Sequence, residues 1–180
     1  MASWNKVARR IRVPLGFLFA AVYLWLARPT TRSIVLGGCV ALTGLVIRAL
    51  ASGHVQKNEQ LAMTGPYAYT RNPLYLGSLI MACGFALASR SWIVAAIATV
   101  MLFGIYIPVI RSEEEFLRTR FPEFADYCRN VPRLFPKLKA SQGSAGSFSA
   151  HLYWRHREYN AALGAVLMTA ALIVKMLWLR

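Results

Sequence analysis

A series of five apolar segments, separated by short polar stretches, constrains the fold of this chain more than any other feature. The segments span residues 13–27, 34–51, 74–88, 92–110 and 159–179. Because 57% of the 180 residues are hydrophobic, the apolar content exceeds that of soluble domains, and the surplus is expected to face lipid. Backbone groups inside a bilayer must be hydrogen-bonded internally, so helices are the expected spans. The sequence predicts an all-α integral membrane bundle with about five transmembrane helices.

The lengths and connections of these segments predict how they are organised. A helix needs about 20 residues to cross a bilayer without tilt, so segments 13–27 and 74–88 either recruit flanking residues or do not cross completely. Short turns follow the first and third segments and predict two antiparallel helical hairpins. No polar stretch is long enough for a soluble domain of its own. We expect one membrane domain over residues 1–180, with a polar segment at 111–139 and a small-residue linker at 140–150.

The formal net charge of +14 comes from basic residues that flank the apolar segments. One side collects Lys6, Arg9, Arg10, Arg12, Lys57, Arg71 and the loop 111–157, whereas the other holds Arg28, Arg32, Arg90 and Arg180, with Lys175 able to snorkel. The positive-inside rule makes the richer side, with the N-terminus, cytoplasmic. This distribution favours a bacterial inner-membrane protein over a nucleic-acid partner.

Cysteine and histidine spacing predicts neither a disulfide framework nor a metal site. Cys39 and Cys83 lie inside apolar segments, Cys128 lies in a basic one, and no CxxC pair occurs. His151 and His156 have no carboxylate or cysteine partner at a ligand spacing. We therefore expect the protein to work without a metal ion.

Two polar blocks flank the predicted hairpin of segments 74–88 and 92–110. The first, Gly65–Gly77, reads GPYAYTRNPLYLG, and the second begins after residue 110 as RSEEEFLRTRFPEF. We expect the second block to continue the fourth helix until Pro122 interrupts it. Tyr67 and Tyr69 are predicted to be interface aromatics, and Arg48 is predicted to snorkel toward lipid head groups.

The hairpin predicts that the two blocks meet in space. Antiparallel neighbours bring the start of one helix beside the end of the next, so Arg71, Asn72 and Tyr75 are expected near Glu113 and Glu114. A cluster of ionisable residues at the membrane edge is a candidate functional site.

These blocks resemble a known signature. Gly-Pro-Tyr followed by Arg-Asn-Pro-Leu-Tyr-Leu-Gly resembles the Gly-Pro-Tyr and Arg-His-Pro-x-Tyr-x-Gly pattern of the isoprenylcysteine carboxyl methyltransferase and phospholipid methyltransferase superfamily. The residues EEEFL, Phe121, Tyr127 and VPRLFP resemble its second half, over about Gly53–Lys139 in all. Three positions depart from the pattern: Asn72 replaces the usual His, Pro122 replaces Gly, and Asn130 replaces Arg.

The resemblance implies an integral membrane enzyme that uses S-adenosylmethionine. By analogy, its catalytic residues are Arg71 and Glu114. The implied cofactor-binding residues are Asn72, Tyr75, Gly77, Glu113, Tyr127 and Pro132. The implied methyl acceptor is lipophilic, either a prenylcysteine-like carboxylate or a lipid amine.

Two other functions stay open at this point. Sterol reductases with a similar membrane hairpin use NADPH, so cofactor preference separates them from a methyltransferase. A non-catalytic membrane protein is the third possibility, in which the motif has only a structural role. Substitution of Arg71 and Glu114 would then alter stability without affecting ligand binding.

Overall fold

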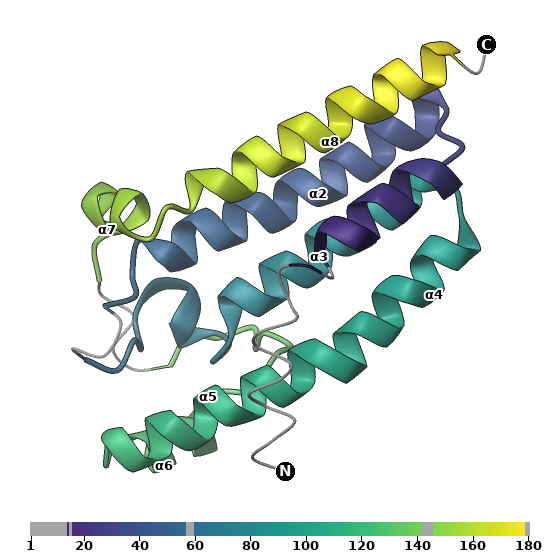
Figure 1. Ribbon diagram of the computed structural model, residues 1–180. Coiled ribbons are helices and arrows are strands. Elements are labelled where there is room, and N and C mark those ends of the chain that lie inside the picture. Colours follow the sequence, from purple (N-terminus) through teal and green to yellow (C-terminus); the bar gives the residue numbers. More distant parts are fainter. Residues whose placement is uncertain (1–13, 15, 57–59, 142–145, 179–180) are drawn as a thin grey trace.

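The computed structural model describes residues 14, 16–56, 60–141 and 146–178, which contain helices and no strands (Figure 1). The elements are a helix Gly16–Leu26, α2 Thr31–Ser52, η1 Gly65–Ala68, α3 Pro73–Ser89, α4 Trp92–Met101, η2 Leu102–Tyr106, α5 Ile107–Arg120, α6 Phe124–Asn130, α7 Ala150–Arg155 and α8 Tyr159–Trp178. The prediction of an all-α fold is confirmed for this part of the chain. The basic residues Lys6, Arg9, Arg10, Arg12, Lys57 and Arg180 and the segment ends at 13 and 179 lie outside the described residues.

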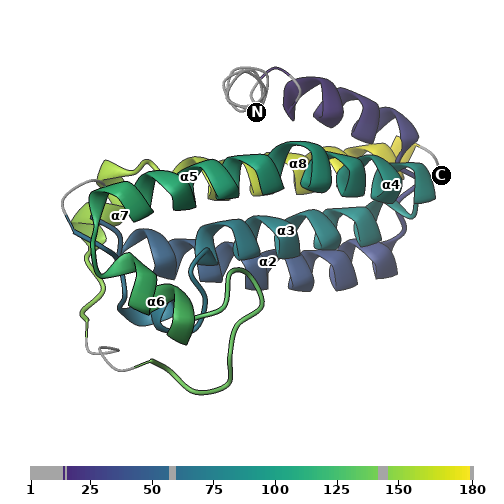
Figure 2. The same ribbon diagram turned by 90° about the horizontal axis from the view of Figure 1, so that it is seen from below.

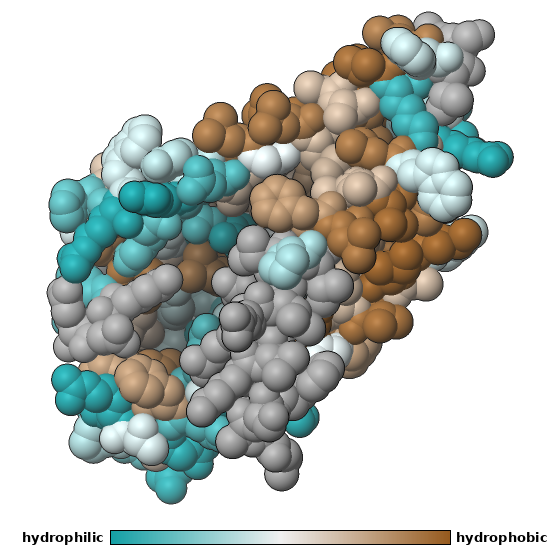
Figure 3. Space-filling model, viewed as in Figure 1, coloured by the Kyte–Doolittle hydropathy of each residue, from teal (hydrophilic) through white to brown (hydrophobic). Residues whose placement is uncertain are grey.

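Three of the described helices are long and apolar enough to cross a membrane: α2, the continuous helix Trp92–Arg120, and α8. The helix Gly16–Leu26 and α3 are shorter, as the lengths of segments 13–27 and 74–88 predicted. The fold therefore supports three complete spans by length, against about five in the sequence prediction. Apolar side chains cover much of the bundle surface, and polar ones gather at the end that carries α5 and α7 (Figure 3).

Helices α2 and α3 pack through a seam of glycines. A Cβ at Gly37 would lie 2.3 Å from the carbonyl oxygen of Gly84, and one at Gly44 would lie 2.4 Å from that of Gly77. The backbones are therefore in direct contact. In a bilayer, where lipid is as apolar as a side chain, this close packing is what holds two helices together. The seam fixes the start of α3, which forms the end of the Gly65–Gly77 block.

At the opposite end of the bundle, an apolar cluster joins the helices. Tyr23, Ala27, Ala88, Val94 and Leu172 are all buried there. The Arg28 amide donates to Ser89 O at 2.9 Å, which ties the first interhelical turn to the second. Lys175 of α8 donates to the carbonyls of Leu24 and Trp25. These carbonyls lie at the end of the helix Gly16–Leu26, where no further helical turn supplies a donor.

The long helix Trp92–Arg120 contains a π-helical turn, η2, between α4 and α5. Pro108 follows this turn. Proline lacks an N–H and its ring clashes with the carbonyl four residues earlier, so a wider turn accommodates it without ending the helix. The helix ends at Arg120, and Phe121 is extended (φ −125°, ψ 111°) before Pro122. The predicted continuation of the fourth helix and its interruption at Pro122 are confirmed.

After α6, the chain returns beneath η1 and reaches α7 and α8 (Figure 2). Residue 150, predicted as the last residue of the linker, instead begins α7, because the Ser149 side chain accepts from the amide of Leu152 and caps a short helix. Helix α7 docks on the end of α2, where the Ser149 amide donates to Gly53 O at 3.0 Å. Between α7 and α8, Arg157 has a left-handed φ of 53°, which redirects the chain.

Candidate functional site

The Gly65–Gly77 block is held by backbone hydrogen bonds to the segment after α6. The amide of Arg71 donates to Pro132 O at 3.0 Å, that of Lys137 to Tyr69 O at 3.1 Å, and that of Ser141 to Ala68 O at 3.0 Å. The block begins at Gly65, whose φ of 57° favours glycine and whose missing side chain leaves room for the His54 ring. The two sequence blocks are therefore joined as one structural unit.

Glu114 is the centre of this unit. It is 7% exposed, the Asn72 side chain donates to its Oε1 at 3.1 Å, and Arg133 donates to its Oε2 from Nε at 2.9 Å and from Nη2 at 2.8 Å. Asn72 also donates to Arg133 O at 2.9 Å. Two guanidinium groups and one amide thus surround a single buried carboxyl group, and hydrogen bonds of this kind hold it in a fixed orientation.

Arg71 lies beside Glu114 with capacity for one more contact. Its Nε is 3.7 Å from Glu114 Oε1 and is the one buried side-chain nitrogen or oxygen, among the described residues, that has no hydrogen-bond partner. Its Nη1 donates to the Cys128 sulfur. Buried polar groups are almost always paired in native proteins. An unpaired guanidinium N–H at this position is therefore suited to an acceptor atom of a ligand.

Tyr75 and Glu113 form a second contact between α3 and α5. The Tyr75 hydroxyl donates to Glu113 Oε1 at 2.8 Å, and its ring meets Tyr106 edge to face at 5.9 Å between centroids. Tyr106 belongs to the π-helical turn, so the irregular turn presents an aromatic ring to α3. The predicted approach of Arg71, Asn72 and Tyr75 to Glu113 and Glu114 is confirmed.

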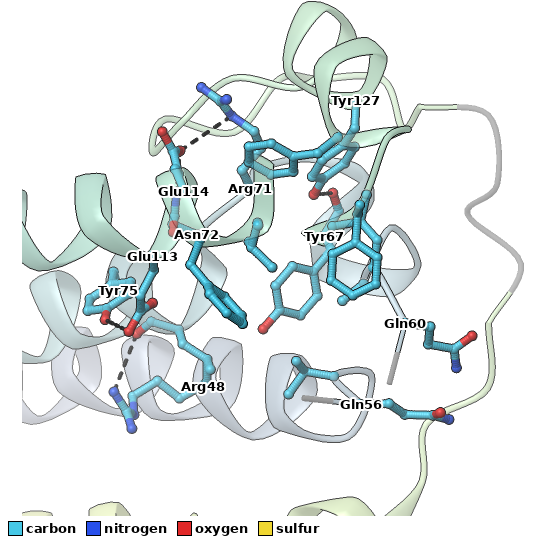
Figure 4. A pocket seen from close by; sticks show the side chains of 18 of the residues that line it. Arg48, Gln56, Gln60, Tyr67, Arg71, Asn72, Tyr75, Glu113, Glu114 and Tyr127 are labelled. Carbon is cyan, nitrogen blue, oxygen red and sulfur yellow. Dashed lines mark hydrogen bonds and ion pairs between the residues drawn. The ribbon is translucent and has the colours of Figure 1, made fainter. Parts of the chain in front are cut away.

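Tyr67 and Tyr127 form the inner wall of a cavity beside Glu114. Tyr127 donates from its hydroxyl to Tyr67 O at 2.7 Å. Burial raises the pKa of both phenols well above the usual range, so both stay neutral at physiological pH. Tyr67 is 8% exposed, which contradicts its prediction as an interface aromatic. The reason is that η1 turns its ring into the space that Tyr127 also borders (Figure 4).

These groups surround a cavity of about 600 Å³ (Figure 4). Its arginine and glutamate lining residues are Arg48, Arg71, Glu113, Glu114 and Glu158. Its apolar wall includes Leu61, Phe116, Leu117, Phe121 and Phe124. A cavity of this size that combines apolar walls with convergent polar groups is suited to a small molecule.

Most of the residues that sequence analysis proposed for the site line this cavity. They are Arg71, Asn72, Tyr75, Glu113, Glu114 and Tyr127. Gly77 and Pro132 are not among the lining residues. Gly77 faces α2, where a Cβ would lie 2.6 Å from Gly44 O and from Arg48 Cγ. Pro132 contributes the carbonyl that holds the Arg71 backbone.

Arg48 and Glu158 also line the cavity, and sequence analysis missed both. Arg48 Nε lies 2.6 Å from Glu158 Oε1, with side chains 23% and 10% exposed. The predicted snorkelling of Arg48 toward lipid is wrong, because this acidic partner and Ser78 hold its guanidinium inside the bundle. Only the presence of an arginine within an apolar segment hinted at such a role.

Replacing Tyr127 with phenylalanine tests how far the inner wall depends on its hydroxyl. We expect Tyr127→Phe to lower the free energy of unfolding by about 1–3 kcal/mol, because a buried carbonyl of Tyr67 loses its donor. Thermal unfolding in detergent measures this effect. Tyr69→Phe is the matched control, since Tyr69 is 39% exposed, and an equal loss in both variants would contradict the expectation.

Comparison with known proteins identifies related sequences. The family model described as phospholipid methyltransferase matches residues 12–123. The chain is 38% identical over 90 residues to the cobalt-zinc-cadmium resistance protein CzcN of Cupriavidus metallidurans, covering 50% of this chain and 42% of that protein. It is 34% identical over 135 residues to the nickel-cobalt-cadmium resistance protein NccN of Alcaligenes xylosoxydans xylosoxydans, covering 71% and 62%.

A third relative carries an enzymatic name. The chain is 24% identical over 142 residues to the protein-S-isoprenylcysteine O-methyltransferase of Schizosaccharomyces pombe, covering 76% of this chain and 60% of that protein. The chain thus spans between 42% and 62% of the length of these three relatives. No solved structure matches. In the described part of the chain, no three His, Cys, Asp or Glu side chains form a group suited to a metal ion.

Proposed function

The chain belongs to the phospholipid methyltransferase family, and from this premise we propose that it transfers a methyl group from S-adenosylmethionine to a lipophilic, membrane-associated acceptor. The acceptor class is a prenylcysteine-like carboxylate or a lipid amine. We further propose that the cavity end faces the cytoplasm of a bacterium, in line with the distribution of basic residues.

The observation that carries this proposal is the junction of the two sequence blocks around one cavity. Asn72 of the first block bonds Glu114 of the second at 3.1 Å, and both line the cavity of about 600 Å³. The family match ends at residue 123 and so includes both residues. A purely structural junction does not require a cavity of ligand size.

The residues present suit the proposed cofactor. Arg71 has a buried N–H without a partner, which an anionic or carbonyl oxygen of the ligand can satisfy. Glu113 is oriented by the Tyr75 hydroxyl and supplies negative charge, and neighbouring rings of Tyr67 and Tyr75 supply π faces that attract a cation. When bound, the cofactor supplies an electrophilic methyl group on a positively charged sulfur.

The chain's own contribution to such a reaction is positioning and exclusion of water. In-line transfer needs donor and acceptor aligned at van der Waals distance, and it disperses charge rather than creating it. Asn72, Glu114 and Arg133 form a rigid frame that fixes the cavity wall. A carboxylate acceptor needs no base, whereas an ammonium acceptor must lose a proton. Glu113 is the candidate base, because among the described glutamates that line the cavity it is the one without an ion pair to arginine.

Ligand binding tests the proposed site directly. We expect the purified protein in detergent to bind S-adenosylhomocysteine in calorimetric titration, and Arg71→Lys to weaken binding at least about 10-fold, because lysine keeps the charge but loses the planar fork. Arg129→Lys is the matched control, since Arg129 pairs with Asp126 at the surface with side chains 81% and 77% exposed. Equal affinity of the wild-type and Arg71→Lys proteins would contradict the assigned role of Arg71.

The class of acceptor is tested by the stability of the product. Radiolabelled S-adenosylmethionine is incubated with the protein and bacterial membranes, and the lipid extract is treated with base. A methyl ester of a carboxylate releases volatile methanol, whereas an N-methyl group stays in the lipid. Binding of NADPH in place of S-adenosylhomocysteine would instead support the reductase alternative.

The relatives named for metal resistance support a second, compatible proposal about the setting of this activity. We propose that loss of the gene lowers tolerance to cobalt, zinc, nickel or cadmium, as the names CzcN and NccN suggest. Growth of a deletion strain on graded metal concentrations tests this, with complementation by the wild-type and Arg71→Lys proteins. Rescue by the wild type alone would link tolerance to the proposed site.

A further inference from the structure

The cavity has a second charged pair, Arg48 and Glu158, that lies outside the two family blocks. Figure 4 shows Arg48 on the side of the cavity opposite Arg71 and Glu114. Glu158 belongs to the segment after residue 123, where the family match ends. The C-terminal part of the chain therefore supplies a wall residue that the family pattern does not describe.

The pair is positioned by several independent contacts. Arg48 donates to Leu74 O at 3.3 Å and to the Ser78 hydroxyl, both on α3. Its contact with Glu158 at 2.6 Å then connects α2 to the start of α8. Arg157, directly before Glu158, adopts a left-handed conformation with a φ of 53°, which is unfavourable for a residue other than glycine. Such strain persists where surrounding structure imposes it, often at functional sites.

Each partner also keeps an unused polar atom. Arg48 bonds through Nε and Nη1, and Glu158 through Oε1. In the described part of the chain, no hydrogen bond reaches Arg48 Nη2 or Glu158 Oε2. Because both side chains line the cavity, this pair retains one donor and one acceptor that a ligand in the cavity could use.

We infer that Arg48 and Glu158 form a binding site for a zwitterionic group, in which an anion pairs with Arg48 and an ammonium pairs with Glu158. The inference rests on the proposed function, because that function supplies two such groups. One is the amino-acid end of the methyl donor, and the other is a zwitterionic lipid head group. The Glu114 cluster suits this role less well, because Asn72 and Arg133 already occupy both of its carboxylate oxygens.

Two soluble probes distinguish binding of the amino-acid end of the cofactor from binding of the rest of the cofactor. S-adenosylhomocysteine carries the amino-acid end, whereas 5′-methylthioadenosine keeps the nucleoside and sulfur but lacks it. If the pair binds that end, Glu158→Gln is expected to weaken the binding of S-adenosylhomocysteine at least about 10-fold in calorimetric titration, since a charge-assisted contact is lost. The affinity for 5′-methylthioadenosine is expected to stay unchanged. The full chain in detergent is used for all titrations, with Asp126→Asn as control.

Lipid probes test whether the zwitterionic group belongs to a lipid head group instead. Dihexanoyl phosphatidylethanolamine has a zwitterionic head group, and dihexanoyl phosphatidylglycerol has an anionic one. Selective loss of phosphatidylethanolamine binding in Glu158→Gln, at unchanged S-adenosylhomocysteine affinity, would support the site and assign it to the acceptor. Unchanged affinity for both S-adenosylhomocysteine and phosphatidylethanolamine would overturn the inference and leave the pair as a link between helices.

A charge-swapped variant distinguishes loss of binding from loss of folding. Arg48→Glu combined with Glu158→Arg keeps an ion pair between α2 and α8 but exchanges the two poles. A purely structural pair predicts wild-type affinity for every probe, whereas a binding site predicts the same selective loss as Glu158→Gln. Failure of the wild-type protein to bind S-adenosylhomocysteine would contradict the proposed methyl transfer, and the lipid titrations would still decide whether the pair binds a zwitterion.

Discussion

Gly44→Ala is expected to lower the free energy of unfolding by about 1–3 kcal/mol or more. A Cβ at this position would lie 2.4 Å from Gly77 O and 2.6 Å from the Met81 amide nitrogen. Both are backbone atoms, so they can yield only if α2 and α3 separate. Because Gly77 is the last residue of the Gly65–Gly77 block, we also expect weaker binding of S-adenosylhomocysteine.

Gly38→Ala provides the matched control for this substitution. Gly38 lies on the same helix, and a Cβ there would meet nothing within 4 Å. Alanine favours helix over glycine by about 0.5–1 kcal/mol, so this variant is expected to be neutral or slightly more stable. Thermal unfolding in detergent measures both variants. Equal melting temperatures would show that the seam does not limit stability.

Glu114→Ala is expected to have the largest effect of any single change in the candidate site. It removes the carboxylate that two arginines and Asn72 share, and it leaves the Arg71 guanidinium, 12% exposed, with its positive charge uncompensated. Removing one partner of a buried pair costs about 3–5 kcal/mol. We expect a clear fall in melting temperature and no measurable S-adenosylhomocysteine binding.

Two further variants distinguish the loss of the Glu114 charge from a general loss of stability. Glu114→Gln keeps the shape and an acceptor for Asn72, so it is expected to unfold at a temperature between those of wild type and Glu114→Ala. Asp126→Asn breaks a surface pair whose side chains are 77% and 81% exposed, and such pairs contribute about 0–1 kcal/mol. Titration is done well below each melting temperature. Wild-type affinity in Glu114→Ala would remove Glu114 from the proposed site.

Local sequence features account for much of the fold. Long apolar segments predict helices because a bilayer allows few other spans, and Pro122 predicts the end of the long helix. The short turn at Arg90 brings the start of α3 near the middle of α5. That topology is sufficient to predict the contact between Asn72 and Glu114, which lie 42 residues apart.

Tertiary structure decided what local pattern does not encode. Arg48 and Glu158 lie 110 residues apart, and no spacing rule connects them. Tyr67 turns inward on η1, which a hydrogen bond from Tyr127 to the Tyr67 carbonyl joins to α6, 60 residues away. The physical reason is general: in helices that are apolar on every side, lipid and protein are equally suitable neighbours. The sequence by itself therefore determined the helices and the meeting of the two blocks, whereas only the packing of those helices decided which side chains face the cavity.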